Sequence, residues 1–296
     1  MGLKVLAKIA VESMHQLGGT RPPSARHIAS GDGWMVSDVV CTAGPGDQPF
    51  EEQHSRSSIT VVMGGTFQYR TVTGRELMTP GAILLGNAGE CFCCGHEHGT
   101  GDRCFAVSYE PEYLERLAAD ALGSNANRAG RRFGVPRLPP LRVLAPLVAK
   151  AATLLARPCG AACEELGIEL AVRVLQNAHG ASPSRATASP SSLARVTRVV
   201  RMIENEPEMP CELRSLAQVA RLSPYHFLRT FEEITGATPH QYLLRVRLRR
   251  AAMRLLAEST RVAEIALACG FGDVSNFNRT FRAEFGMSPV AYRSNG

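Results

Sequence analysis

The sequence of 296 residues lacks any apolar run close to the roughly 18 residues that a membrane-spanning helix needs, which excludes an integral membrane protein. The first sixteen residues resemble a short amphipathic helix. Because Lys8 and Glu12 interrupt it and no small-residue cleavage site follows, we expect no signal peptide. We therefore expect a cytoplasmic protein whose nine cysteines are free thiols or metal ligands rather than disulfides.

The common catalytic motifs are also missing. The sequence contains no phosphate-binding glycine loop followed by Lys and Ser or Thr, no G-x-S-x-G and no H-E-x-x-H. These absences exclude the enzyme classes that depend on those motifs.

Lysine is absent from the C-terminal third. Residues 193–296 hold fifteen basic side chains, all of them Arg, and ten acidic ones, a net charge of +5, whereas residues 1–178 carry 17 of each sign. Because Arg suits bidentate contacts to phosphate and guanine, this excess indicates a polyanionic partner. A solvated surface with a chance bias would give the same counts, so the charge alone leaves both interpretations open.

A stretch of Ser, Ala, Pro and Gly at 179–192 has almost nothing to bury and is typical of a flexible linker, here between domains at 1–178 and 193–296. Before the linker, short alternating apolar runs with glycine turns predict a small antiparallel barrel or double-sheet roll. The predicted strands lie at 34–41, 57–63, 66–72, 81–86 and 104–109. Helical periodicity predicts helices at 111–122, 141–156 and 161–178, of which the last two form a hairpin.

The C-terminal domain is predicted to be helical throughout and contains an internal repeat. The unit is a short helix, a tight turn and a second helix that ends in Gly, which is a helix-turn-helix. We therefore predict an α+β protein, in which a β-rich domain with a helical hairpin precedes an all-α domain with two helix-turn-helix units. The identities at an offset of 50 are Phe227 and Phe277, Arg229 and Arg279, Thr230 and Thr280, Phe231 and Phe281, Gly236 and Gly286, Pro239 and Pro289, and Tyr242 and Tyr292.

The second helix of each unit has two faces. Two phenylalanines four residues apart share one face and should pack on the preceding helix. The opposite face carries side chains able to reach base edges and phosphates in a major groove. The helix predicted at 239–257 is about 27 Å long, enough to set two reading helices roughly one DNA turn apart. The alternative is that the paired hairpins merely pack. The candidate reading residues are Tyr225, His226, Leu228, Arg229 and Glu232, and Val274, Ser275, Asn278, Arg279 and Arg282.

Two segments carry a specific resemblance, LAQVARLSPYHFLRTFEEITGATPHQYLLRVRLRRA and VAEIALACGFGDVSNFNRTFRAEFGMSPVAYR. Together they resemble the DNA-binding domain of the AraC/XylS family of bacterial transcription regulators, over about a third of the chain. The resemblance implies that the two recognition helices enter successive major-groove segments of double-stranded promoter DNA. It places Tyr225, Leu228 and Arg229 against bases in the first helix and Val274, Ser275, Asn278 and Arg279 in the second, with flanking arginines on phosphates.

The upstream domain looks like the cupin-type effector domain and dimerisation helices of such regulators. This similarity implies a homodimer, a small-molecule effector and, for an activator, contact with RNA polymerase. We find no diagnostic motif in this part of the sequence.

A second cluster of chemistry lies in CFCCGHEHGTGDRC, which gathers cysteines and histidines within fourteen residues. Thiolate and imidazole are the usual ligands of zinc, and a tetrahedral site needs four of them. We predict a zinc site formed by Cys91, Cys94, Cys104 and one of His96 and His98. Cys41 and His54, on neighbouring predicted strands, could substitute.

Other interpretations of this cluster remain open. Arg103 and the histidines could lower thiol pKa values and make a redox or electrophile sensor, or the segment could be a buried cysteine-rich strand. A metal-dependent cupin enzyme would need two histidines and a carboxylate, which a thiolate-rich site disfavours, and the cysteine spacing does not match the zinc-thiolate alkyl acceptors. We predict a transcription regulator, not an enzyme, whose N-terminal domain senses an effector, a metal or a thiol-reactive signal.

Overall fold

The structure is a computed structural model that describes residues 23–97, 99, 101–123, 133–178, 188–210 and 212–294. The chain divides into two compact units, Met1–Ser189 and Pro190–Gly296. The division falls inside the segment predicted as a linker, and the first helix of the second unit begins three residues before the predicted domain start at 193. The predicted N-terminal amphipathic helix and residues 179–187 lie outside the described residues. None of the described helices has the length and hydropathy to cross a membrane.

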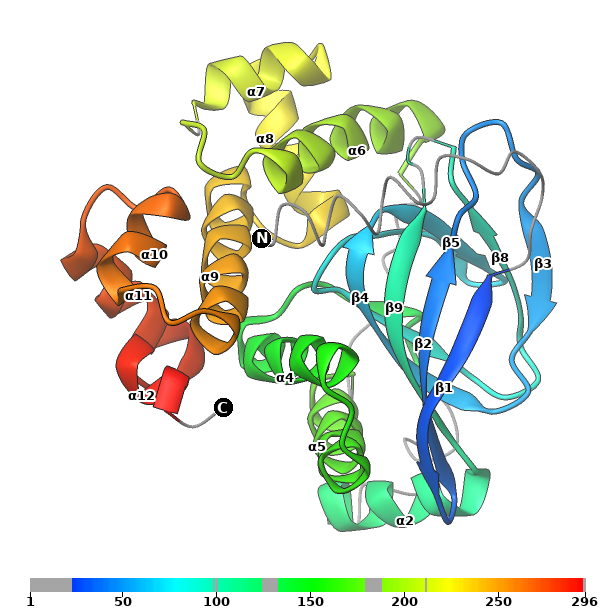
Figure 1. The fold of residues 1–296 in the computed structure, drawn as a ribbon. Coiled ribbons are helices and arrows are strands. Elements are labelled where there is room, and N and C mark those ends of the chain that lie inside the picture. Colours follow the sequence, from blue (N-terminus) through cyan, green and yellow to red (C-terminus); the bar gives the residue numbers. More distant parts are fainter. Residues whose placement is uncertain are drawn as a thin grey trace. The chain divides into compact units, whose positions relative to one another are not determined.

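The first unit contains two antiparallel β-sheets (Figure 1). The larger sheet has the strand order β1 (Ser24–Gly31), β2 (Trp34–Cys41), β9 (Asp102–Tyr109), β4 (Ser57–Gly65), β7 (Ile83–Gly86) and β10 (Arg137–Leu138). The smaller has the order β3 (Phe50–Gln53), β8 (Cys91–Gly95), β5 (Phe67–Thr71) and β6 (Gly74–Met78). The five strands predicted from alternating patterns correspond to β2, β4, β5, β7 and β9.

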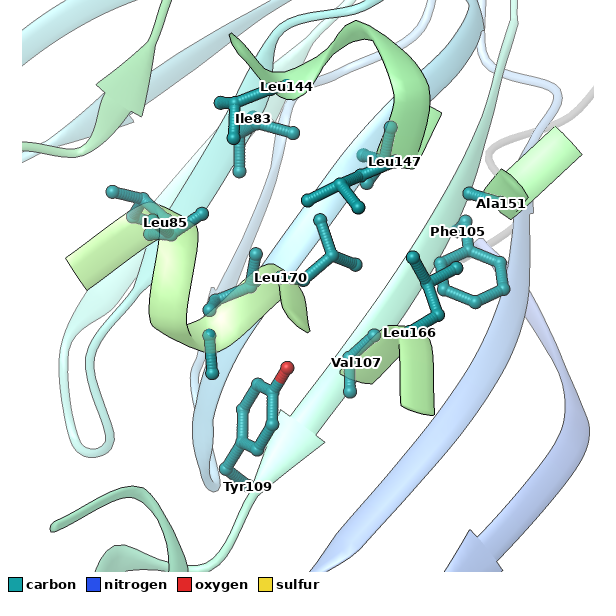
Figure 2. Packing of buried hydrophobic residues seen from close by; sticks show 14 of the residues in the cluster. Ile83, Leu85, Phe105, Val107, Tyr109, Leu144, Leu147, Ala151, Leu166 and Leu170 are labelled. Carbon is teal, nitrogen blue, oxygen red and sulfur yellow. The ribbon is translucent and has the colours of Figure 1, made fainter. Parts of the chain in front are cut away.

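The larger sheet is apolar on both faces. Successive side chains of a strand point to opposite sides, and several of its strands carry apolar residues at successive positions. One face packs on helices α2 (Pro111–Leu122), α4 (Ala145–Ala156) and α5 (Gly160–Ala178). Figure 2 shows this core, in which Phe105 and Val107 of β9 lie against Leu166 of α5. The opposite face, which includes Val62 and Cys104, packs on the smaller sheet. The unit is therefore built in three layers, helices, larger sheet and smaller sheet.

The predicted helical hairpin is present. Helices α4 and α5 contact each other and are separated by three residues. The Tyr109 hydroxyl donates a hydrogen bond of 2.7 Å to the carbonyl oxygen of Gly167, which ties α5 to β9. The hairpin thus belongs to the core of the first unit.

The second unit is helical, as predicted, which confirms the α+β class. Polar caps and prolines begin its helices, as the sequence indicates. The side chains of Ser223, Thr238 and Asp273 accept hydrogen bonds from the first turns of the helices they precede, and Gly236 and Gly286 end two helices with φ of 77° and 76°. The described helices are α6 (Pro190–Asn205), α7 (Leu213–Ala220), α8 (Pro224–Thr235), α9 (Pro239–Ala257), α10 (Val262–Ala268), α11 (Val274–Phe285) and α12 (Pro289–Ser294).

The repeat in the sequence is also a repeat in the packing. In the first copy, Phe231 packs on Phe227 and edge-on against Tyr242, at ring-centroid distances of 5.5 and 5.8 Å. In the second copy, the equivalent rings of Phe277, Phe281 and Tyr292 lie 5.4 and 5.3 Å apart in the same arrangement. The four phenylalanines are fully buried. The pairs α7–α8 and α10–α11 are therefore two copies of one helix-turn-helix, joined by α9.

Candidate nucleic-acid interface and a buried cysteine–histidine cluster

Helices α8 and α11 each turn a polar face outward. Because their phenylalanines are buried at positions four apart, the residues between them lie on the other side of the helix. All ten candidate reading residues are described, and none is fully buried. Leu228 and Val274 are partly buried, and the others are exposed, namely Tyr225, His226, Arg229, Glu232, Ser275, Asn278, Arg279 and Arg282. Their contact with DNA stays a prediction.

Two of these side chains have features suited to a docking surface. Tyr225 is 68% exposed although its ring is large and apolar. Arg279 donates a hydrogen bond of 3.0 Å to the side-chain oxygen of Asn276 one turn earlier, which holds the guanidinium along the exposed face. A partly fixed Arg loses less side-chain entropy when it binds a base edge or a phosphate.

Some of the arginines in the C-terminal third form contacts within the protein. Arg247 donates to the carbonyl oxygens of Pro207 and Met209 at 2.6 and 2.9 Å. Arg293 donates to the carbonyl oxygen of Thr260 at 2.6 Å, and Arg254 forms an ion pair with a neighbouring carboxylate. These arginines fasten chain segments within the unit. The exposed arginines near the two turns are Arg214, Arg221, Arg229, Arg261, Arg279 and Arg282.

A half-buried carboxylate beside α9 connects α6 to the first helix-turn-helix. Both oxygens of Glu204, on α6, accept hydrogen bonds of 2.8 Å from Arg249, and one accepts a bond of 2.9 Å from the Tyr242 hydroxyl. Arg250 also donates to the backbone oxygen of Glu204. The side chains of Glu204 and Arg249 are only 18% and 15% exposed. This network joins α6 to the helix that carries the aromatic partner of α8.

In the first unit, the cysteine-rich run forms strand β8, and this corrects part of the predicted metal site. Residues three apart in a strand point to opposite faces. Cys94 packs against the core between the sheets, whereas Cys91 is exposed. Cys91 and Cys94 therefore do not belong to one ligand set, because the C-x-x-C spacing would bring them together only in a turn or helix. His98 lies outside the described residues.

The structure brings a different group together. One ligand atom from each of Cys41, His96 and Asp102 lies within 4.8 Å of the others, and all three residues are buried. The His96 Nε2 and Asp102 Oδ2 atoms are 2.7 Å apart, and the Cys104 thiol donates to Asp102 Oδ1 at 3.3 Å. His54, the other suggested substitute, instead hydrogen-bonds the Tyr69 hydroxyl at 2.8 Å. We call Cys41, His96 and Asp102 the inter-sheet cluster.

The position of the inter-sheet cluster follows from strand pairing. Cys41 at the end of β2 pairs directly with Asp102 at the start of β9 in the larger sheet. His96 directly follows β8 of the smaller sheet. The cluster therefore joins the two sheets at one end of the space between them. Asp102 was not a candidate from the sequence, and its only signal was its position between the histidines and Cys104.

The charges in this region oppose a reactive thiol. Burial raises the pKa of both Cys94 and Cys104, and the neighbouring Asp102 carboxylate raises it further. Both are therefore protonated thiols at neutral pH, which disfavours these two cysteines as the reactive groups of a redox or electrophile sensor, because the thiolate is the reactive form. Burial would lower the pKa of His96, but Asp102 and the neighbouring Cys41 raise it to about 9. His54 differs, because burial lowers its pKa to about 4.

Known proteins match the helical unit. Residues 216–295 match the family model of a helix-turn-helix domain. The chain is 35% identical over 91 residues to the probable transcriptional regulator LumQ of Photobacterium leiognathi, which covers 31% of this chain and 37% of that protein. It is also 35% identical over 100 residues to the HTH-type transcriptional activator RhaS of Enterobacter sp. (strain 638), 34% of this chain and 36% of that one.

A solved structure matches the same region. It is a transcriptional regulator with an AraC-type DNA-binding domain from Chromobacterium violaceum, with 30% sequence identity over 36% of this chain and 95% of that one, at a TM-score of 0.34. The matches to LumQ and RhaS span only about a third of the length of those relatives.

Two helix-turn-helix units joined by one long helix define the second unit as a double helix-turn-helix domain. The family match lies within this unit. Residues 216–295 of this unit match a helix-turn-helix family model, and the chain is similar to proteins named as transcriptional regulators.

Proposed function

We propose that this protein is a cytoplasmic transcription regulator that binds a specific site on promoter DNA through α8 and α11. The observation that carries the proposal is the double helix-turn-helix with a polar, arginine-bearing exposed face on each second helix. Side chains on such faces can read base edges, while arginines beside the turns bind phosphates. Relatives named as regulators, rather than as enzymes, support the same assignment.

The two faces suit different contacts. On α8, Arg229 has the donors for guanine or phosphate, and the apolar Leu228 can only meet a thymine methyl group or exclude water. On α11, Asn278 can bind adenine through two hydrogen bonds, and Arg279 and Arg282 provide two positive charges. Together the helices would read two segments separated by about one turn of DNA, roughly 10 base pairs.

We infer that the first unit is a cupin-type sensor and that α4 and α5 form a homodimer contact. The sheets packed on a helical hairpin support this assignment. The relative RhaS is named a transcriptional activator, which favours activation and contact with RNA polymerase for this chain too. The signal is a small organic effector, a metal or a thiol-reactive compound.

The test is selection of bound sequences from a random DNA pool with the full-length protein, followed by footprinting on a selected site. The proposal predicts one enriched motif with two protected segments about one helical turn apart. Enrichment without a motif, or protection of a single segment, would show that only general phosphate binding or one reading helix is at work. Light scattering with and without DNA measures the oligomeric state on the same samples.

A further inference from the structure

We propose that Cys41, His96 and Asp102 are the ligands of a metal site for zinc or a similar borderline-soft divalent ion, built between the two sheets of the first unit. A thiolate, an imidazole and a carboxylate are all zinc ligands, and three protein ligands suffice for a site whose fourth position is open. The proposal concerns the first unit alone and does not depend on DNA binding.

The distances fit an ion at the centre of the cluster. Ligand atoms of a tetrahedral zinc site lie about 2.0–2.3 Å from the metal, which places them roughly 3–4 Å apart. The three candidate atoms lie within 4.8 Å of one another, and His96 Nε2 and Asp102 Oδ2, which are 2.7 Å apart, would have to separate slightly to admit an ion. The Cys104 thiol lies beside the cluster and donates a hydrogen bond of 3.3 Å to the other oxygen of Asp102.

Burial supports a ligand role. Cys41, His96 and Asp102 are only 3%, 4% and 8% exposed, and buried charged groups are found paired or bound to metals. Among the residues that the structure describes, the buried ring nitrogen Nδ1 of His96 has no hydrogen-bond partner, so the contact to Asp102 alone does not satisfy the histidine. A histidine that only fills a core would use both ring nitrogens.

The backbone places the three ligands where one bound ion would connect the two sheets. Cys41 and Asp102 are paired across β2 and β9, and His96 lies beyond the end of β8. An ion held by all three would cross-link the larger sheet to the smaller one. Its loss would loosen the contact between the sheets, so the folded first unit should be more stable with metal than without it.

The alternative is a buried His96–Asp102 ion pair with no metal. It accounts for the 2.7 Å contact, but it leaves the Nδ1 atom of His96 without a hydrogen-bond partner among the described residues. Metal binding distinguishes the two accounts.

The experiment is metal analysis of the reduced full-length protein, followed by chelation and titration of the apo form with Co²⁺ and Zn²⁺. The proposal predicts about one ion per chain and a thiolate-to-cobalt charge-transfer band in the near-ultraviolet that Zn²⁺ abolishes. The wild-type protein without such a band, under reducing conditions, would overturn the proposal and needs no variant.

Variants then identify the ligands. Cys41→Ser and Asp102→Asn should each weaken Zn²⁺ binding at least about 100-fold, since removal of a mere supporting contact costs 10–100-fold. Cys91→Ser is the matched control, because Cys91 is exposed and Cys94, on the same strand, faces the core. Trp34 lies in the core between the larger sheet and the helices, and its fluorescence checks that each variant is folded. Loss of the cobalt band in Cys91→Ser but not in Cys41→Ser would contradict the assignment.

Discussion

Glu204→Gln should destabilise the second unit and leave the first unit unchanged. The substitution removes the negative charge that faces the guanidinium of Arg249 and leaves that charge buried. Removing one partner of a buried ion pair costs about 3–5 kcal/mol. Because both side chains retain some exposure and Gln keeps an acceptor for the Tyr242 hydroxyl, we expect about 2–3 kcal/mol here. For a unit of this size that loss lowers Tm by roughly 10–20 °C.

The assay uses the single tryptophan as a reporter. Trp34 lies in β2, so its fluorescence follows the first unit, whereas far-ultraviolet circular dichroism also follows the helices of the second. Glu204→Gln should shift a circular dichroism transition to lower temperature with no change in the fluorescence transition. Glu206→Gln is the control, because Glu206 is exposed at the end of α6. A loss no larger than that of the control, or an equal shift of the Trp34 transition, would refute the reasoning.

Two further substitutions test the fold with the same probes. Gly270→Ala should lower the free energy of unfolding by about 1–3 kcal/mol, because Gly270 has a φ of +90° and a Cβ there would lie 2.9 Å from the Glu208 Cα. Gly272→Ala is the control and should lower it much less in the same circular dichroism experiment, because there is open space around Gly272. Asp38→Asn should lower the fluorescence midpoint at pH 7, because burial opposes ionisation of Asp38 but Arg103 and a second arginine lower its pKa. A carboxyl whose pKa is lowered by folding stabilises the folded state at pH values above the pKa of the unfolded chain, which is about 4 for Asp. The difference in midpoint between wild type and Asp38→Asn should therefore disappear as the pH falls through the folded-state pKa of Asp38. A difference that persists below that pH would exclude this ion-pair effect.

The helical unit was predictable from its sequence because its signals are local. Ser-Pro, Thr-Pro and glycine mark helix ends through backbone contacts within one turn, and in the structure α8 and α9 begin at the prolines of such pairs. The repeat added long-range information, since Phe231 and Phe281 must sit in equivalent packing. The outward faces of α8 and α11 followed from the inward ones.

The metal candidates were predicted only in part, because their arrangement depends on strand pairing. The spacing of Cys91 and Cys94 predicts a ligand pair only when the chain turns between them, and here it is extended. The approach of Cys41 to Asp102 is set by the register of β2 and β9, which no local pattern specifies. The arginine count shows a similar limit, because composition does not distinguish Arg247, which donates hydrogen bonds to carbonyl groups, from the exposed Arg229.

The most direct test of the account measures binding of wild type, Arg229→Ala and Arg279→Ala to the selected DNA site and to unrelated DNA at fixed salt. Each substitution should weaken binding to the selected site by about 1–3 kcal/mol, roughly 5- to 150-fold, and should relax preference at the base it contacts. Arg116→Ala, an exposed arginine of the first unit, should have little effect. Wild-type affinity for the selected site in both recognition-helix variants would contradict the assignment of α8 and α11 as the reading helices.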